Sequence, residues 1–167
     1  MTVIHKSIDV DVPVRTAYDQ WTQFEEFPRF LEGVKEVRQL DDKRIYWQAE
    51  ILGKKVEWEA EIIQQIPDQR ITWRSISGAE NGGSIAFLPL TSDRTRIEIH
   101  MEFKPGGATE SLGTAFGIVA ARIEGDLQRF QSFIESRQRA TGEWRGEIHG
   151  PEVVVPLSSA ESEPRDD

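Results

Sequence analysis

The sequence predicts one α+β domain in which a curved antiparallel sheet of seven strands surrounds a single long C-terminal helix. Six consecutive runs between residues 34 and 103 alternate apolar and polar side chains, which is typical of strands with one wet face. A seventh alternating run lies near the N-terminus. From residue 109 to residue 141 the apolar spacing becomes helical. The helix is the one large element available to cover the apolar face of the sheet.

The N-terminal region predicts one strand followed by two short helices. Residues 3–12 alternate loosely and end at Pro13, and residues 14–24 have helical spacing. We expect Pro28 to open the second short helix, because proline is tolerated at the first helical position. Aromatic residues recur every three positions here, and we expect them to cap and line the mouth of an apolar hollow: Trp21, Phe24, Phe27 and Phe30.

The six later runs predict the rest of the sheet, and their inward positions are strongly apolar. The runs cover residues 34–40, 45–51, 56–62, 71–75, 84–88 and 96–103. The inward side chains include Trp47, Trp58, Trp73, Phe87, Ile99 and Met101. Glu57, Glu59 and Glu61 alternate with them, which indicates a solvated face rather than catalytic carboxylates. The pair Gly82-Gly83 is interpreted as part of a turn.

The C-terminal region predicts a helix and then a tail. Thr109 is a plausible N-cap, and Gly142 is a conventional stop. The apolar stripe of this helix includes Phe116 and Ile123, and Ala120 flanks it. From residue 142 onward the chain carries a net charge of −5 out of −9 and has no usable period. We therefore predict a domain over residues 1–141 and an acidic, disordered tail over residues 142–167.

The composition argues against several classes of function. A net charge of −9 without a Lys/Arg cluster argues against a nucleic-acid partner. The absence of cysteine excludes thiol catalysis and disulfides, and the three histidines lack metal-ligand spacing. No metal or other cofactor is therefore expected. Because the sequence shows neither a signal-peptide pattern nor about 20 consecutive apolar residues, we expect a cytoplasmic location without stable membrane insertion.

The order of elements resembles the helix-grip fold of the START-like superfamily, also called SRPBCC. The stretch YDQWTQFEEFPRFLEGVKEV is similar to the segment after the first strand in polyketide cyclase/dehydrase and coenzyme Q-binding START-like families. The matching positions are Tyr18, Trp21, Phe24, Phe27, Pro28, Phe30, Val34 and Val37. The stretch GDLQRFQSFIESR resembles the family's terminal helix. The resemblance covers roughly residues 2–139, and it implies an apolar cavity between sheet and helix.

Three functions stay open at this point. The first is binding or transport of a hydrophobic small molecule, such as a lipid, quinone, isoprenoid or polyketide. The second is an aromatase-type polyketide cyclase or dehydratase that uses the same cavity. Such an enzyme needs titratable groups inside the cavity, and the inward set offers none, so binding is favoured and no catalytic residue is assigned. The third is an interaction protein with a vestigial pocket.

The predicted partners follow from the same hypotheses. We expect a hydrophobic small molecule, a monomer or weak homodimer, and at most a transient membrane contact through the aromatic mouth. Ile118 on the outer face of the helix is the candidate dimer contact. The predicted cavity residues share an inward position and an apolar side chain: Phe24, Phe27, Phe30, Trp47, Trp58, Trp73, Phe87, Ile99, Met101, Phe116, Ala120 and Ile123.

Overall fold

A computed structural model describes residues 2–51, 53–103 and 112–156, with the backbone alone for residues 2, 103 and 112–119. Its elements, in chain order, are β1 (Thr2–Val10), α1 (Val14–Trp21), the 3₁₀ helix η1 (Phe24–Arg29), β2 (Val34–Gln39), β3 (Arg44–Ile51), β4 (Lys54–Ile66), β5 (Arg70–Gly78), β6 (Asn81–Thr91), β7 (Arg94–Phe103), α2 (Leu112–Arg137), β8 (Glu147–His149) and β9 (Glu152–Val154). Within these described residues, no helix is long and apolar enough to cross a membrane.

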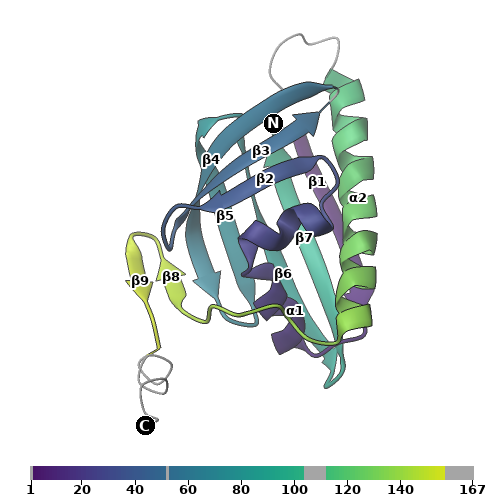
Figure 1. The fold of residues 1–167 in the computed structure, drawn as a ribbon, viewed down its shortest axis with the longest axis vertical. Coiled ribbons are helices and arrows are strands. Elements are labelled where there is room, and N and C mark those ends of the chain that lie inside the picture. The colour runs from purple at the N-terminus through teal and green to yellow at the C-terminus, as the bar shows by residue number, and fades with distance from the viewer. Residues whose placement is uncertain (1, 52, 104–111, 157–167) are drawn as a thin grey trace.

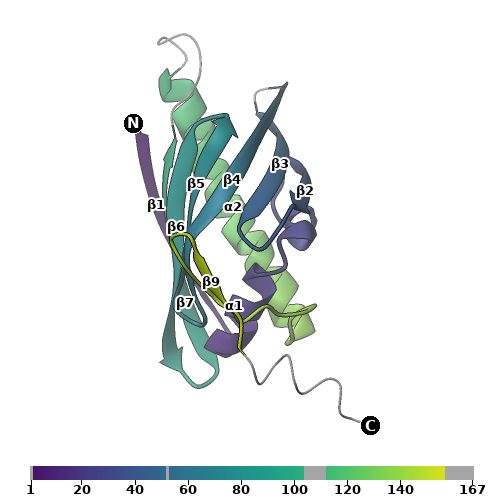
Figure 2. The same cartoon turned by 90° about the vertical axis from the view of Figure 1, so that its left-hand side faces the viewer.

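The predicted fold class is confirmed. The main sheet has the antiparallel order β1-β7-β6-β5-β4-β3-β2 and curves around α2 (Figure 1). The view from the side shows α2 behind the sheet and the short helix α1 near its lower end (Figure 2). The alternation holds as well, because Ile71, Ile85 and Ile97 are buried whereas Glu57 on the other face is exposed. The strand count is higher than expected, since β8 and β9 extend the sheet to nine strands within the described part of the chain.

Pro28 lies at the penultimate position of η1 instead of opening a helix. The helix begins earlier because the Glu26 amide already donates to the Gln23 carbonyl at 3.0 Å. Phe24 and Phe27 thus share one short helix, and both side chains are buried. The expected second helix exists, but the aromatic residues before the proline belong to it.

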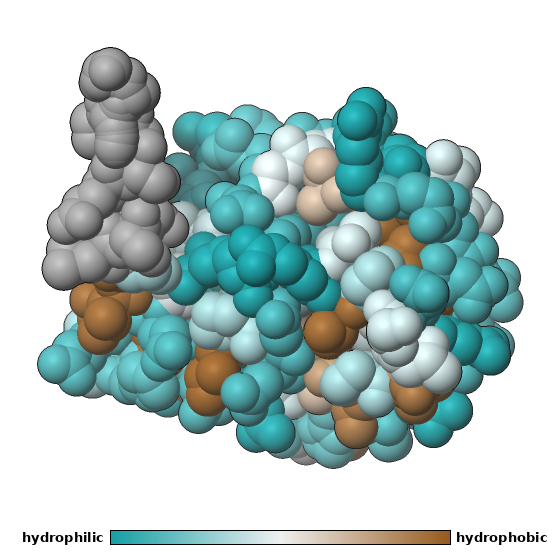
Figure 3. Space-filling model, turned by 90° about the horizontal axis from the view of Figure 1, so that it is seen from below, coloured by the Kyte–Doolittle hydropathy of each residue, from teal (hydrophilic) through white to brown (hydrophobic). Residues whose placement is uncertain are grey.

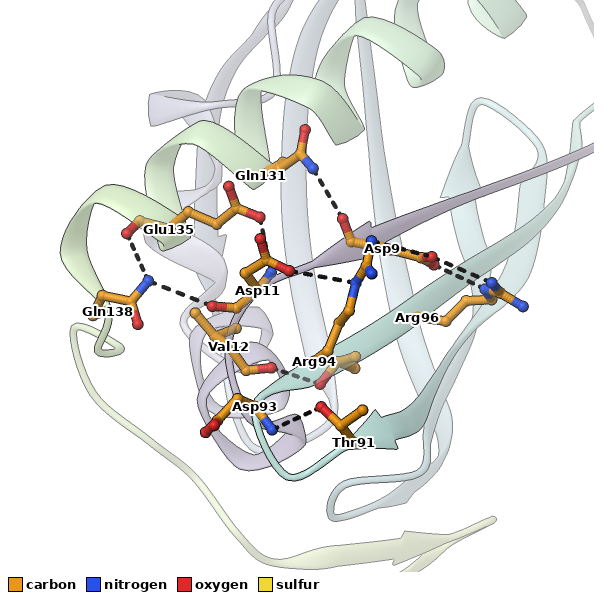
Figure 4. Close-up of polar contacts among 11 residues, drawn as sticks. Asp9, Asp11, Val12, Thr91, Asp93, Arg94, Arg96, Gln131, Glu135 and Gln138 are labelled. Carbon is orange, nitrogen blue, oxygen red and sulfur yellow. Dashed lines mark hydrogen bonds and ion pairs between the residues drawn. The ribbon is translucent and has the colours of Figure 1, made fainter.

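The C-terminal end of α2 is anchored to β1 by polar contacts (Figure 4). The Gln131 side-chain amide donates to the Asp9 carbonyl at 2.9 Å, and the Asp11 backbone amide donates to Glu135 Oε2 at 2.8 Å. On the other side of β1, Arg96 forms a bidentate ion pair with the Asp9 carboxylate. Since β1 is fixed between α2 and β7, this end of the helix has a defined position against the sheet.

The first part of the predicted tail is ordered, so the prediction of disorder is wrong for residues 142–156. Strand β3 pairs with β4 only as far as Glu61, and β8 takes its place beside Gln64 and Gln65. Ile148 of β8 is fully buried in the main core. A single buried isoleucine in an acidic segment gave too weak a periodic signal to reveal this strand. Residues 157–167 lie outside the described part of the chain.

Arg145 ties this segment to α1 and to the β4–β5 turn. Its guanidinium donates to the carboxylate of Asp19 and, at 2.8 Å, to that of Asp68. It also lies 5.5 Å from the ring centre of Tyr18. Burial raises the pKa of Asp19 to about 6, and the charge of Arg145 opposes that rise. The side chains of Asp19 and Arg145 are only 7% and 15% exposed, so this is a buried ion pair.

The Arg145→Ala variant is expected to lower the free energy of unfolding by about 3 kcal/mol, because it removes the buried partner of the Asp19 carboxylate and leaves the exposed Arg15 at 3.5 Å. Urea denaturation of both proteins measures this difference. Arg139→Ala is the matched control, since Arg139 is exposed and should change stability by less than about 0.5 kcal/mol. Equal stability of the two variants would show that residues 142–156 do not contribute to the packed domain.

Candidate ligand-binding cavity

A hollow of about 170 Å³ lies between the concave face of the sheet and α2. Residues of α1 and η1 close one end, and inward residues of β2 to β7 form the wall opposite α2. The lining is almost entirely apolar, and the polar side chains in it are Asn81 and Asp126. The hollow therefore suits an apolar molecule that makes few polar contacts.

The structure brings eight of the twelve predicted cavity residues together around this hollow. They come from η1, four strands and α2: Phe24, Phe27, Trp47, Trp58, Trp73, Ile99, Met101 and Ile123. The alternation of the strands places them there, because every second residue of a strand faces the same side. Their contact with a ligand stays a prediction.

Three of the other four predicted residues do not line the hollow in the structure. Phe30 is fully buried in the core, where its ring centre lies 5.1 Å from that of Phe130. Phe87 packs edge-on against Tyr18 at 5.4 Å, at the end of the sheet that α1 fills. Ala120 is half-buried on α2 and is not part of the lining. The side chain of Phe116 lies outside the described part, as does that of Ile118.

Stacked aromatic rings form one wall. Trp47 and Trp58 face each other in register across β3 and β4, and their rings are nearly parallel with centres 5.5 Å apart. Phe27 packs against the Trp47 ring at 5.5 Å, and Trp21 packs against Phe27 at 5.2 Å. Phe24 is part of the same cluster. The aromatic spacing of residues 21–30 thus builds a buried end wall continuous with the sheet.

A glycine in mid-strand makes room for the third tryptophan. Gly83 lies opposite Trp73 in register, and a Cβ at Gly83 would come within 3.1 Å of the Trp73 ring and 2.9 Å of Met101 Cα. The interpretation of Gly82-Gly83 as part of a turn is therefore wrong, since both residues belong to β6. Glycine inside a strand often marks such a close approach. Trp73 Nε1 donates to Asn81 Oδ1 at 3.1 Å, which satisfies its buried polar group.

Asp126 is the residue that the sequence reasoning missed. It is nearly buried, and its Oδ1 accepts hydrogen bonds from the Glu32 amide at 2.9 Å and from the Arg129 guanidinium. Burial raises the pKa of Asp126, and these two hydrogen bonds oppose the rise. A signal was present, because position 126 is three residues after Ile123 and four before Phe130 and so shares their helical face.

A smaller hollow of about 90 Å³ adjoins the main one between β3, the loop before β2 and α2. Trp58, Met101 and Asp126 line both hollows. Arg122 forms part of its rim and donates to the Glu50 carbonyl at 2.7 Å. Gly33 has a φ of +90° and leaves no space for a Cβ beside the Arg122 guanidinium. The molecular surface seen from below mixes exposed apolar residues with polar ones (Figure 3).

Residues 10–132 match the family described as "Polyketide cyclase / dehydrase and lipid transport". The chain belongs to this family. A relative from Streptomyces lincolnensis is 44% identical over 149 residues, which are 89% of this chain and 99% of that protein. It is described as an uncharacterized 17.2 kDa protein in the melC2-rnhH intergenic region.

Solved structures of other proteins share the fold. DR_A0006 from Deinococcus radiodurans is 26% identical, with a TM-score of 0.66 over 82% of this chain and 99% of that one. TTHA0849 from Thermus thermophilus is 18% identical, with a TM-score of 0.72 over 81% and 99% of the two chains. The ZhuI aromatase/cyclase from Streptomyces sp. R1128 is 13% identical, with a TM-score of 0.70 over 85% and 98%. At the two lower identities the likeness concerns the fold alone.

The Gly83→Ala variant is expected to lower the free energy of unfolding by about 2–3 kcal/mol, because the added methyl group collides with the β7 backbone and the Trp73 ring. Thermal and urea melts measure the loss. Ser84→Ala, on the opposite face of the same strand, should stay within about 0.5 kcal/mol of the original protein. A neutral Gly83→Ala would contradict the close packing of Trp73 over β6.

Proposed function

We propose that the protein binds or transports a hydrophobic small molecule in the cavity between the sheet and α2. The observation that supports this proposal most directly is the hollow of about 170 Å³ with its nearly continuous apolar and aromatic lining. A cavity of about 150 Å³ lined by apolar side chains can stay dry and bind benzene. A hollow of this size and lining favours a small ring system over water, since water would lack polar partners there.

The family supports this class of ligand without naming one, because its description covers both cyclases and lipid transport. A lipid, quinone, isoprenoid or polyketide all present the apolar surface that the lining requires. Stacked rings at Trp47 and Trp58 favour a flat molecule among these, because a planar ring can pack along the aromatic wall. We also propose that the protein is cytoplasmic and that its contact with a membrane is at most transient.

The second candidate is a polyketide cyclase or dehydratase that acts in the same cavity. Asp126 favours it, because a carboxyl group of raised pKa inside an apolar cavity is the kind of group that general acid–base catalysis uses. The ZhuI aromatase/cyclase shares the fold, which makes the candidate reasonable but assigns no activity to this chain. Binding is the step that both candidates require.

Filling the cavity tests this proposal. Ala60 is buried and lines the hollow, so the larger side chain of Ala60→Leu takes up part of that space. We expect the affinity for naphthalene to fall at least about tenfold, as measured by quenching of tryptophan fluorescence. The variant should still fold, because the larger side chain enters space that is already open.

Ala86→Leu is the matched control, because Ala86 lies on the outer face of β6 between two inward residues. This variant should bind naphthalene like the original protein. If naphthalene binds Ala60→Leu as tightly as the original protein, the hollow is not the binding site. If the original protein binds no apolar ring at all, the proposed function is wrong.

A further inference from the structure

Trp73 and Asn81, two of the polar side chains in the cavity wall, are hydrogen-bonded to each other and to the backbone. The Trp73 N–H donates to Asn81, and the Asn81 amide in turn donates to the Ala79 carbonyl at 3.2 Å. The Trp47 Nε1 atom has no partner among the described residues, but it is too deeply enclosed to be reached. Asp126 differs from these groups, because it combines an unused acceptor atom with a position in the lining.

Both hydrogen bonds to Asp126 within the described residues end on the same oxygen. The Glu32 amide and the Arg129 guanidinium donate to Oδ1, and Oδ2 has no hydrogen-bond partner there. The residue itself is 8% exposed. Asp126 therefore keeps one carboxylate oxygen without a partner among the described residues, in a side chain that lines both hollows.

The protein holds Asp126 in this place by contacts on its other side. Arg129 donates to the Phe30 carbonyl through Nε at 3.2 Å, and it also pairs with Glu32 at 3.3 Å. These contacts position the guanidinium beside Oδ1, which favours a charged acceptor at position 126. An acceptor left bare in an apolar wall costs free energy, and a donor on a ligand would remove that cost.

We propose that Asp126 accepts a hydrogen bond from a hydroxyl group of the bound molecule, so that the ligand is a hydroxylated aromatic or polycyclic compound. Asp126 lines both hollows where they adjoin, so a ring in the main hollow can direct its substituent there. A quinone offers only acceptors at this point, and a fatty carboxylate would add a second negative charge. This inference rests on the proposed function, and it selects among the ligand classes which that function leaves open.

Two probes of equal size test it in the unaltered protein. 2-Naphthol and 2-methylnaphthalene differ only in a hydroxyl or methyl group at one position. Without a hydrogen bond the methyl compound should bind more tightly, because its transfer from water is more favourable. We expect the opposite order, with 2-naphthol bound about tenfold more tightly at pH 7, because hydrogen bonds to charged groups are strong. Isothermal titration calorimetry measures both affinities.

The Asp126→Asn variant keeps one acceptor oxygen for Glu32 and Arg129 but can place an N–H₂ group at the free position. We expect its preference for 2-naphthol to disappear, while 2-methylnaphthalene binds with unchanged affinity. Glu124→Gln is the matched control on α2, because Glu124 is exposed and pairs with Lys6. This control should keep the preference for 2-naphthol.

The outcomes separate this inference from the proposed function. If both probes bind but 2-methylnaphthalene binds as tightly as 2-naphthol or more tightly, the role of Asp126 is wrong and the apolar binding site stands. If Asp126→Asn retains the preference, another group recognises the hydroxyl and the inference is overturned. If neither probe binds the unaltered protein, the proposed function fails and the inference fails with it.

Discussion

One straight helix can cover only part of the concave face of a curved sheet, and this geometric mismatch shapes the molecule. At the C-terminal end of α2 the contact is complete, because Phe130 and Ile134 are fully buried. Nearer its N-terminus, Ile123 and Leu127 face the hollow instead. The polar contacts of Gln131 and Glu135 with β1 hold the packed end in place. The hollow is therefore a consequence of how the layers meet.

The wall of the hollow combines large aromatic rings with small residues at a few positions beside them. Gly83 allows Trp73 to lie over β6, and Ala60 leaves open volume opposite α2. Asp126 places a carboxylate in surroundings that otherwise exclude polar groups, and Arg129 compensates one of its oxygens. Such a combination gives a ligand two kinds of contact. Apolar area supplies most of the affinity, and one polar atom can distinguish between ligands of similar shape.

The fold and most of the lining could be predicted from the sequence, because strand alternation and helical spacing are local and repeat many times. Positions such as Trp47, Trp58 and Met101 follow from that alternation. Phe30 and Phe87 were misplaced, since periodicity tells which face a residue occupies but not how far along the cavity it lies. Asp126 was missed although it shares a helical face with Ile123 and Phe130, because the periodic signal of that face comes from its apolar side chains.

The C-terminal segment was a different kind of failure. Its strand pairs with β4, which is far away in sequence, and its ion pair joins Arg145 to Asp19 across 126 positions. No local pattern encodes such a pairing. The acidic composition of the segment indicated disorder. The segment is ordered nevertheless, because one isoleucine and one arginine are buried against the rest of the domain. Composition describes the average of a segment, whereas a few contacts decide whether it packs.

The central claim is that apolar molecules enter the hollow between the sheet and α2, and the five tryptophans test it most directly. Trp21, Trp47, Trp58 and Trp73 line the hollow, whereas Trp144 lies outside its lining. The measurement is a titration of ¹⁵N-labelled protein with naphthalene, followed through the indole N–H signals in ¹H–¹⁵N NMR spectra. The account predicts that the four lining signals shift with one common affinity and that the Trp144 signal stays in place. Shifts confined to Trp144, or no shifts at saturating naphthalene, would contradict it.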